Sequence, residues 1–216
     1  MEMKLVEKIK KKLQDPLATF KLFERLIAAI CIAIPAILWL TDTGNGCTEI
    51  GVDDPCVYNL HPILRSSISD YVYMRHSYVF GMLLTTAAML FIFNGAVYFR
   101  NEERLQVRKA GKWYNVILGI SLLLVIVFPY KQYRIPHYFF AGIFFLGNAF
   151  VIGKYHRPKY RVISNLLAWL TAAFIAIGAL KILSLLWGEW LSLAVIGVHL
   201  ILEAKGDISK DSLTEH

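Results

Sequence analysis

Six long apolar blocks dominate the chain and limit what it can fold into. Each holds roughly 15 to 22 residues, which as an α-helix is long enough, or nearly so, to cross a hydrocarbon layer about 30 Å thick. The blocks are Leu22–Leu40, Tyr78–Phe99, Trp113–Tyr130, Ile135–Gly153, Val162–Leu180 and Trp187–Leu202. Hydrophobic residues make up 56% of the sequence, against about 45–50% in a soluble domain. We therefore predict an all-α, polytopic membrane protein built as a bundle of six transmembrane helices.

The basic residues are distributed unevenly over the predicted loops. The formal net charge is +7, and 18 of the 23 lysines and arginines fall on one side of the predicted bundle. Cytoplasmic loops retain positive charge, so we expect both the N- and the C-terminus in the cytoplasm. The excess of basic residues therefore serves to orient the chain in its membrane, and we expect no nucleic-acid partner.

Two polar segments flank the predicted membrane domain, which covers residues 22–204. Residues 1–21 form a basic cytoplasmic segment in which four apolar residues share one helical face. This pattern is typical of a helix lying on an anionic membrane surface, and equally of a basic tail that serves only to orient the chain. Residues 205–216 form a cytoplasmic tail.

The segment 41–72 is the longest predicted loop and lies on the outer side of the membrane. A loop of this size often covers one end of a helix bundle. It contains Cys47 and Cys56, which we expect to form a disulfide in an oxidising compartment, the alternative being two free thiols. Cys31 lies inside the first apolar block and is predicted to be a small packing residue.

Polar side chains at membrane depth fall into two layers. The outer layer comprises Asp42, His76, His137 and Glu189, and the deeper layer comprises Asn94, Asn148 and His199. Such groups are costly in a bilayer, so each indicates a contact or a function. His76 and Asn94 are five helical turns apart, and His137 and Asn148 about three, so we expect each pair to share a face directed into the bundle. The deeper layer is predicted to form interhelical hydrogen bonds.

The outer layer and the stretch SISDYVYMRHS beside it have two interpretations. In the first they line a polar ligand pocket that opens outward, formed by Ser67, Ser69, Asp70, Arg75, His76, His137, Glu189 and Asp42. Two imidazoles and a carboxylate can also bind zinc and leave a position for water, so His76, His137 and Glu189 are the candidate metal ligands. In the second interpretation these groups pair with one another and serve only the fold.

Three stretches carry a resemblance to a known family: SISDYVYMRHSYVFGMLL, IPHYFFAGIFFLGNAFVI and LLWGEWLSLAVIGVHLILEAKGD. They resemble a bacterial family of six-helix membrane proteins without assigned function, the domain-of-unknown-function group nine-nine-eight and its relatives. The matching positions are Ser67, Ile68, Ser69, Tyr71, His137, Ala141, Phe144, Phe145, Glu189, Lys205 and Gly206. His76 lies where the pattern has no histidine. The resemblance implies a six-helix protein of the bacterial inner (plasma) membrane and implies no activity.

A shorter stretch, WLTDTGNG, resembles the first outer loop of DRAM-like and Sfk-like membrane proteins, which are linked to lipid and membrane regulation. Together these observations predict a protein that binds a membrane lipid or amphiphile, or a membrane protein partner, through its outer pocket. The alternative is a zinc-dependent hydrolase that acts on lipid substrates at the outer leaflet.

Overall fold

The computed structural model describes residues 16–42, 64–100, 113–154 and 160–205. These residues form six α-helices and one 3₁₀ helix, and they contain no β-strand. The elements are α2 (Pro16–Thr41), η1 (Ile68–Tyr73), α3 (Ser77–Arg100), α5 (Tyr114–Val127), α6 (Arg134–Lys154), α7 (Arg161–Ala179) and α8 (Leu185–Ala204). The predicted all-α class is confirmed for this part of the chain.

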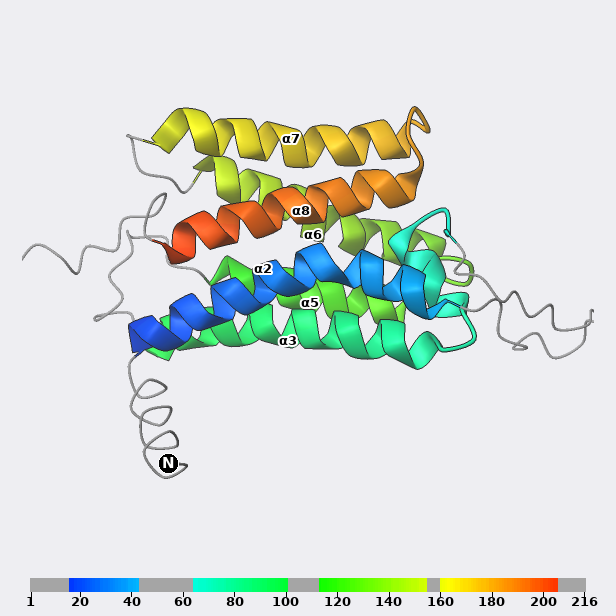
Figure 1. Ribbon diagram of the computed structural model, residues 1–216, viewed down its shortest axis with the longest axis horizontal. Helices are drawn as coiled ribbons and strands as arrows, with labels where there is room; N and C mark the ends of the chain where they lie inside the picture. The colour runs from blue at the N-terminus through cyan, green and yellow to red at the C-terminus, as the bar shows by residue number, and fades with distance from the viewer. Residues whose placement is uncertain (1–15, 43–63, 101–112, 155–159, 206–216) are drawn as a thin grey trace, which may run out of the picture.

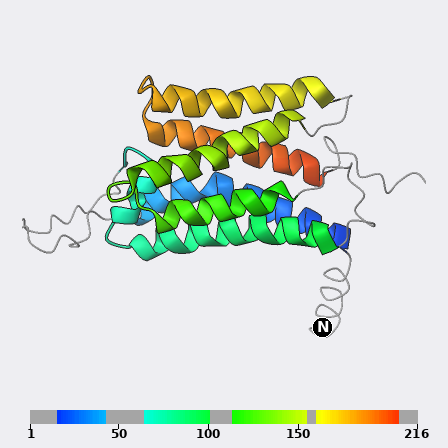
Figure 2. The same ribbon diagram turned by 180° about the vertical axis from the view of Figure 1, so that it is seen from behind.

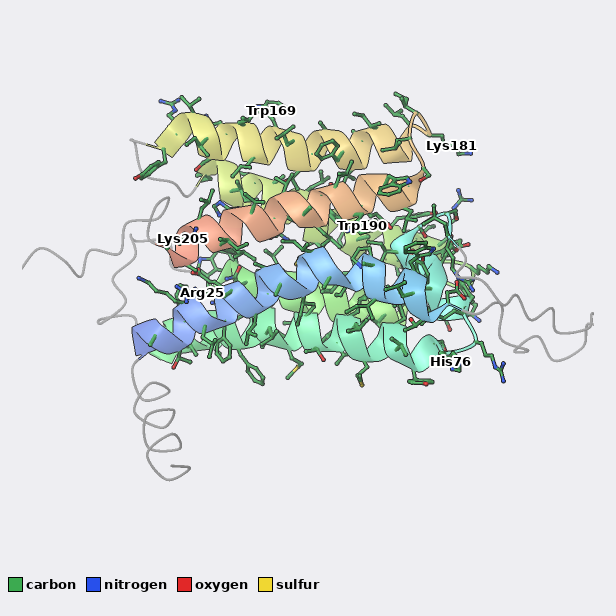
Figure 3. All side chains as sticks on the ribbon, viewed as in Figure 1. Arg25, His76, Trp169, Lys181, Trp190 and Lys205 are labelled. Atoms are coloured by element: carbon green, nitrogen blue, oxygen red, sulfur yellow. The ribbon has the colours of Figure 1, made fainter. Side chains whose placement is uncertain are left out.

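The six α-helices form one bundle in which each helix packs against the next along the chain, and α8 packs back against α2. Successive helices alternate in direction, so α2 begins and α8 ends at the same end of the bundle (Figure 1). The opposite end carries η1 and the α5–α6 and α7–α8 turns (Figures 1 and 2), and we call it the η1 end. Figure 3 shows Arg25 and Lys205 at one end and His76 and Lys181 at the η1 end.

Five of the described helices, α2, α3, α6, α7 and α8, are long and apolar enough to cross a membrane. The remaining predicted span, Trp113–Tyr130, contains the shorter helix α5 of 14 residues, which is about 21 Å long. α5 ends at Val127 because Pro129 follows closely, and the residue before a proline is disfavoured in the α conformation. Five candidate spans are therefore present, and the six-span count with cytoplasmic termini stays a prediction.

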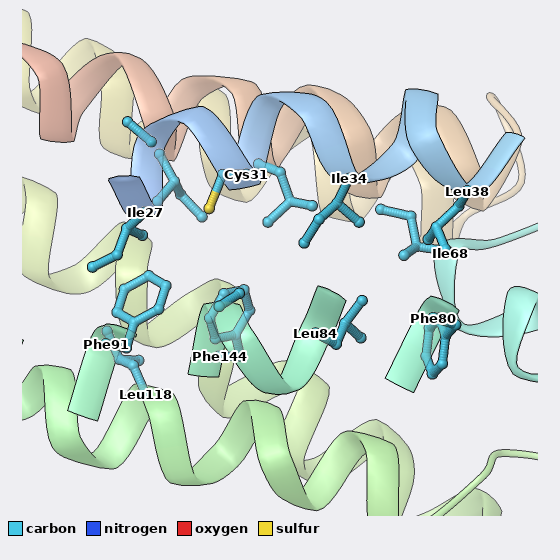
Figure 4. Packing of buried hydrophobic residues seen from close by; sticks show 14 of the residues in the cluster. Ile27, Cys31, Ile34, Leu38, Ile68, Phe80, Leu84, Phe91, Leu118 and Phe144 are labelled. Carbon is cyan, nitrogen blue, oxygen red and sulfur yellow. The ribbon is translucent and has the colours of Figure 1, made fainter. Parts of the chain in front are cut away.

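Apolar side chains of α2 and α3 form the centre of the bundle. Ile27, Cys31, Ile34 and Leu38 recur every three or four residues on one face of α2, all at most 4% exposed. Figure 4 shows this face directed toward Phe80, Leu84 and Phe91 of α3, with Leu118 of α5 and Phe144 of α6 beside them. The role predicted for Cys31, a buried packing residue, is confirmed.

Three predictions concern segments outside the described residues. The disulfide between Cys47 and Cys56 falls on residues 43–63. Most of the basic N-terminal segment falls on residues 1–15, and most of the C-terminal tail on residues 206–216. All three stay predictions.

Candidate functional site

A hydrogen-bonded cap fixes the chain at the start of η1. The Ser67 hydroxyl accepts a hydrogen bond from the Asp70 N–H at 3.2 Å, and the Asp70 carboxylate accepts one from the Ser67 N–H at 3.1 Å. This reciprocal pair is a capping box with aspartate in the place of glutamate. The Ser66 hydroxyl also donates to the Asp70 carboxylate. Asp70 therefore serves first to hold the backbone of η1 in place.

The first turn of α8 holds η1 against the bundle through two hydrogen bonds. The Leu186 N–H donates to the carbonyl oxygen of Ser66 at 2.8 Å. The Ile68 N–H donates to Oε2 of the buried Glu189 at 2.6 Å. An N–H in the first turn of a helix has no partner within that helix, so the carboxylate satisfies a group that burial would otherwise leave unpaired. Glu189 thus positions η1 over the end of the bundle.

Asp42 has a different role from the one predicted for it. Its completely buried carboxylate accepts two hydrogen bonds from Arg65, from Nε at 2.5 Å and from Nη2 at 3.0 Å. Such a two-pronged arginine–carboxylate contact is strong and directional. The Arg65 guanidinium also lies 5.7 Å from the centre of the Tyr71 ring. The pair fastens the end of α2 to the segment before η1, and Asp42 does not line the cavity described next.

A cavity of about 800 Å³ lies between η1, α6, the end of α7 and the start of α8. We call it the η1 cavity. Five of the eight predicted pocket residues line it, namely Ser67, Ser69, Asp70, His137 and Glu189. Its volume lies within the ~300–1,000 Å³ usual for small-molecule sites. The structure therefore brings these five residues together, from three separate elements, around one space large enough for a ligand.

The lining of the η1 cavity changes from polar to apolar along α6. The α6 residues that line it recur at helical spacing and are Arg134, His137, Tyr138, Ala141, Gly142, Phe145 and Leu146. Twelve residues separate the first from the last, a rise of about 18 Å along one helix face. The polar members lie nearest the η1 end, and the apolar members lie deeper. Ile175 of α7 also lines the cavity. The cavity is therefore amphipathic along its length.

His137 lines the η1 cavity and, in the part of the chain that the structure describes, makes a hydrogen bond with only one of its ring nitrogens. The residue is 3% exposed, and its Nδ1 lies 2.8 Å from the carbonyl oxygen of Phe128. A carbonyl only accepts hydrogen bonds, so Nδ1 carries a proton, and Nε2 is the ring nitrogen that can act as an acceptor. Within the described residues Nε2 has no hydrogen-bond partner. It is left to accept a hydrogen bond from a ligand.

A second, smaller cavity of about 50 Å³ lies deeper in the bundle. It shares five residues with the η1 cavity, of which three are polar, and its other lining residues are mainly apolar. The shared residues are Ser69, His137, Ala141, Phe145 and Glu189. A cavity of this size has room for at most a few water molecules. The three polar residues that it shares with the η1 cavity lie at the boundary between that cavity and the apolar interior.

Tyr130 extends the polar end of the η1 cavity. Burial and a hydrogen bond with Asp70 raise the pKa of its phenol to about 12. The phenol is therefore neutral at physiological pH, and its hydrogen bond with Asp70 links the α5–α6 turn to η1.

The remaining predicted pocket residues lie elsewhere. Arg75 is exposed and His76 half-buried, and neither lines the η1 cavity. His76 contacts Tyr78, with 5.7 Å between ring centres, and lies at the opposite edge of the η1 end from Lys181 (Figure 3). α3 begins at Ser77, so His76 immediately precedes that helix, and the face it was predicted to share with Asn94 stays a prediction.

The predicted zinc ligands are not assembled into a metal site. Among the described residues, no three or more His, Cys, Asp or Glu side chains are grouped so as to hold a metal ion. His137 and Glu189 share the η1 cavity, but His76 lies outside it. A catalytic zinc site requires three protein ligands around one ion, and the described residues do not provide this arrangement.

The deeper polar layer behaves partly as predicted. Nδ2 of Asn94 donates to the Phe20 carbonyl oxygen of α2 at 3.4 Å, and Nδ2 of Asn115 on α5 donates to Oδ1 of Asn94 at 2.5 Å. Asn94 thus joins three helices, as expected of a buried amide in a membrane bundle. The amide of Asn148 instead bonds to Phe144 in its own helix, and Nε2 of His199 lies 3.6 Å from the carboxylate of Glu203, one turn further on.

Five residues that make interhelical or loop contacts or line the η1 cavity were not predicted from the sequence. They are Arg65, Asn115, Tyr130, Arg134 and Lys181. Three of them carry positive charge on the side predicted to be poor in it. Because outer loops of membrane proteins usually carry few basic residues, a lysine or arginine on that side indicates a local contact or function. This signal in the sequence could have identified the three cations. For Tyr130 the only signal was its position beside a proline-containing turn.

Comparison with known proteins places the chain in a family. A family model described as "Family of unknown function (DUF7103)" matches residues 33–204, most of the 216-residue chain. The matched region includes α3 to α8, η1, the last part of α2 and every residue that lines the η1 cavity. No curated protein and no solved structure matches the chain significantly. The resemblance to group nine-nine-eight stays a prediction. With its five candidate membrane spans and its amphipathic cavity, the chain belongs to the DUF7103 family of unknown function.

Proposed function

We propose that this membrane protein binds a lipid or another amphiphile in the η1 cavity. The observation that carries the proposal is the change from polar to apolar lining along about 18 Å of α6. An amphiphile has the same change along its own length. A site for a fully polar solute would not need the apolar half, and a packing void would not need the polar half.

The polar end offers groups that suit a headgroup. Nε2 of His137 accepts hydrogen bonds, and the hydroxyl of Ser69 and the carboxylate of Glu189 line the same region. The deeper end offers only contact with apolar side chains, such as Phe145, Leu146 and Ile175. A headgroup would therefore lie under η1 while the acyl chains extend along α6 and α7.

Binding, rather than metal-dependent hydrolysis, is the activity that this arrangement favours. A zinc-dependent lipid hydrolase needs three ligands around one ion, and His76 lies outside the cavity that His137 and Glu189 share. If the η1 end faces outward, as the distribution of basic residues predicts, the amphiphile comes from the outer leaflet.

Two glycines provide a matched test of the proposal. Gly142 lines the η1 cavity, and a Cβ added there meets no atom within 4 Å. Gly81 on α3 has the same free space and lines neither cavity. A side chain can therefore start at either glycine without a clash at Cβ. Gly142→Phe is designed to occupy the cavity, and Gly81→Phe adds the same side chain elsewhere.

The experiment measures the lipid that each protein retains after purification in dodecyl maltoside, by mass spectrometry of extracted lipids. Wild type and Gly81→Phe are expected to retain about one lipid per chain, and Gly142→Phe to lose most of it. Equal retention by all three proteins, with Gly142→Phe folded, would show that the η1 cavity is not the binding site.

A further inference from the structure

We infer that the amphiphile is a phospholipid with a net negative phosphate headgroup, held by Arg134 and Lys181 at the rim of the η1 cavity. The inference rests on the proposed function and adds the chemical class of the ligand. Both cations line the cavity. They come from different elements, Arg134 from the start of α6 and Lys181 from the α7–α8 turn.

Arg134 is available to a ligand. It is exposed, it begins α6, and its guanidinium lies 5.9 Å from the centre of the Tyr138 ring. It makes no ion pair with any of the described residues. A guanidinium stacked near an aromatic ring keeps its N–H groups free in the ring plane, and their fork matches the oxygens of a phosphate.

Lys181 holds its position at a cost to the backbone. The Ile182 N–H bonds to the Ile177 carbonyl oxygen at 3.1 Å, and the Lys181 N–H bonds to that of Gly178 at 3.0 Å. This is the Schellman arrangement that ends a helix, and its left-handed position is usually glycine. Lys181 has a φ of 61° there and is exposed at the cavity rim. Glycine would adopt this backbone conformation with less strain than lysine. The presence of lysine therefore indicates that its positive charge has a function at this position.

The two acidic groups of the cavity are hydrogen-bonded to the segment around η1 and form no direct ion pair with these cations. Asp70 accepts hydrogen bonds from Ser66 and from the Ser67 N–H, and Glu189 accepts one from the Ile68 N–H. Neither carboxylate forms an ion pair with Arg134 or Lys181. Arg134 and Lys181 at the rim are therefore left to pair with an incoming phosphate.

Replacing Lys181 by glycine separates binding from folding. Lys181→Gly removes the charge and also the left-handed strain, so it is expected to stabilise the fold while it weakens binding. If Lys181 had only a structural role, Lys181→Gly would either change stability and lipid affinity in the same direction or leave lipid affinity unchanged. Lys131→Gln is the matched control, because Lys131 is also an exposed cation at the η1 end but lies 4.3 Å from the centre of the Tyr73 ring and outside the cavity.

The probes are dioctanoyl phosphatidic acid, dioctanoyl phosphatidylcholine, dioctanoylglycerol and inorganic phosphate, titrated calorimetrically into delipidated full-length protein. We expect phosphatidic acid to bind most tightly. Loss of one partly exposed charge-assisted contact in Lys181→Gly should weaken that binding about five- to tenfold. Arg134→Gln should have a similar effect. Lys131→Gln should leave all affinities unchanged, and dioctanoylglycerol should bind wild type and Lys181→Gly equally.

The possible results separate the two proposals. Equal affinity for the three lipids, all abolished by Gly142→Phe, would overturn the phosphate inference and leave the amphiphile site intact. Inorganic phosphate binding as tightly as phosphatidic acid would show a free-anion site and overturn the lipid assignment. Binding of all lipids unaffected by Gly142→Phe would refute the proposed function itself.

Discussion

Gly119 provides a quantitative test of how closely α3 and α5 pack. A Cβ added at Gly119 would lie 2.6 Å from the backbone oxygen of Ala88 and 2.7 Å from Cγ1 of Ile92. The first distance is 0.8 Å short of the 3.4 Å at which ordinary contact begins. Because the Ala88 oxygen belongs to the backbone, Gly119→Ala can be accommodated only if the two helices move apart. Close approach through small residues is a main source of helix association in membranes.

Overpacking of this kind typically costs about 1–3 kcal/mol. The gain in helix propensity from glycine to alanine returns up to ~1 kcal/mol. With the full propensity gain, we therefore expect Gly119→Ala to lower the free energy of unfolding by about 1 kcal/mol, and by about 2 kcal/mol at most. Gly81→Ala, with open space around the new Cβ, receives only the propensity gain and should be as stable as wild type or slightly more stable.

The assay is unfolding by sodium dodecyl sulfate added to dodecyl maltoside micelles, followed through the fluorescence of the five tryptophans. A lower midpoint for Gly119→Ala, with Gly81→Ala at or above wild type, supports the packing argument. If Gly119→Ala is at least as stable as wild type, α3 and α5 separate freely and the reasoning is refuted.

The same unfolding assay tests three further predictions. Glu189→Leu leaves the Ile68 N–H without an acceptor and should cost about 1–3 kcal/mol, whereas Glu189→Gln keeps an acceptor and should cost less; equal losses would contradict the hydrogen bond. Asp42→Ala leaves the Arg65 charge buried and should cost about 3–5 kcal/mol, and the double variant Asp42→Leu/Arg65→Met should recover much of that loss, a result that simple additivity would exclude. The pKa of Tyr130 is raised from the usual 10 to about 12, so the folded state favours the neutral phenol. Its contribution to stability is complete below pH 10 and is lost as pH rises to about 12, and Tyr130→Phe should remove this pH dependence.

The polar residues around η1 show how far sequence reasoning reaches. The capping pattern Ser-x-x-Asp and the position of Glu189 near the start of an apolar block are visible in the sequence. The structure places them with His137 around one cavity, and the ligand-binding role of that cavity stays a prediction. The sequence could not exclude Asp42 and His76 from that group, because all these residues lie at the same predicted depth. Only the order of helices around the bundle separates them.

Apolar length and periodicity determined the helical class, the approximate helix boundaries and the buried face of α2, because a bilayer permits few other structures for such a chain. The distribution of basic residues determined the predicted orientation. The tertiary structure decided which polar groups meet: it paired Asp42 with Arg65, joined Glu189 to η1, and left Arg134 and Lys181 at the rim of the η1 cavity. These contacts join residues far apart in the chain, and their geometry depends on how the helices pack against one another, which no local pattern encodes.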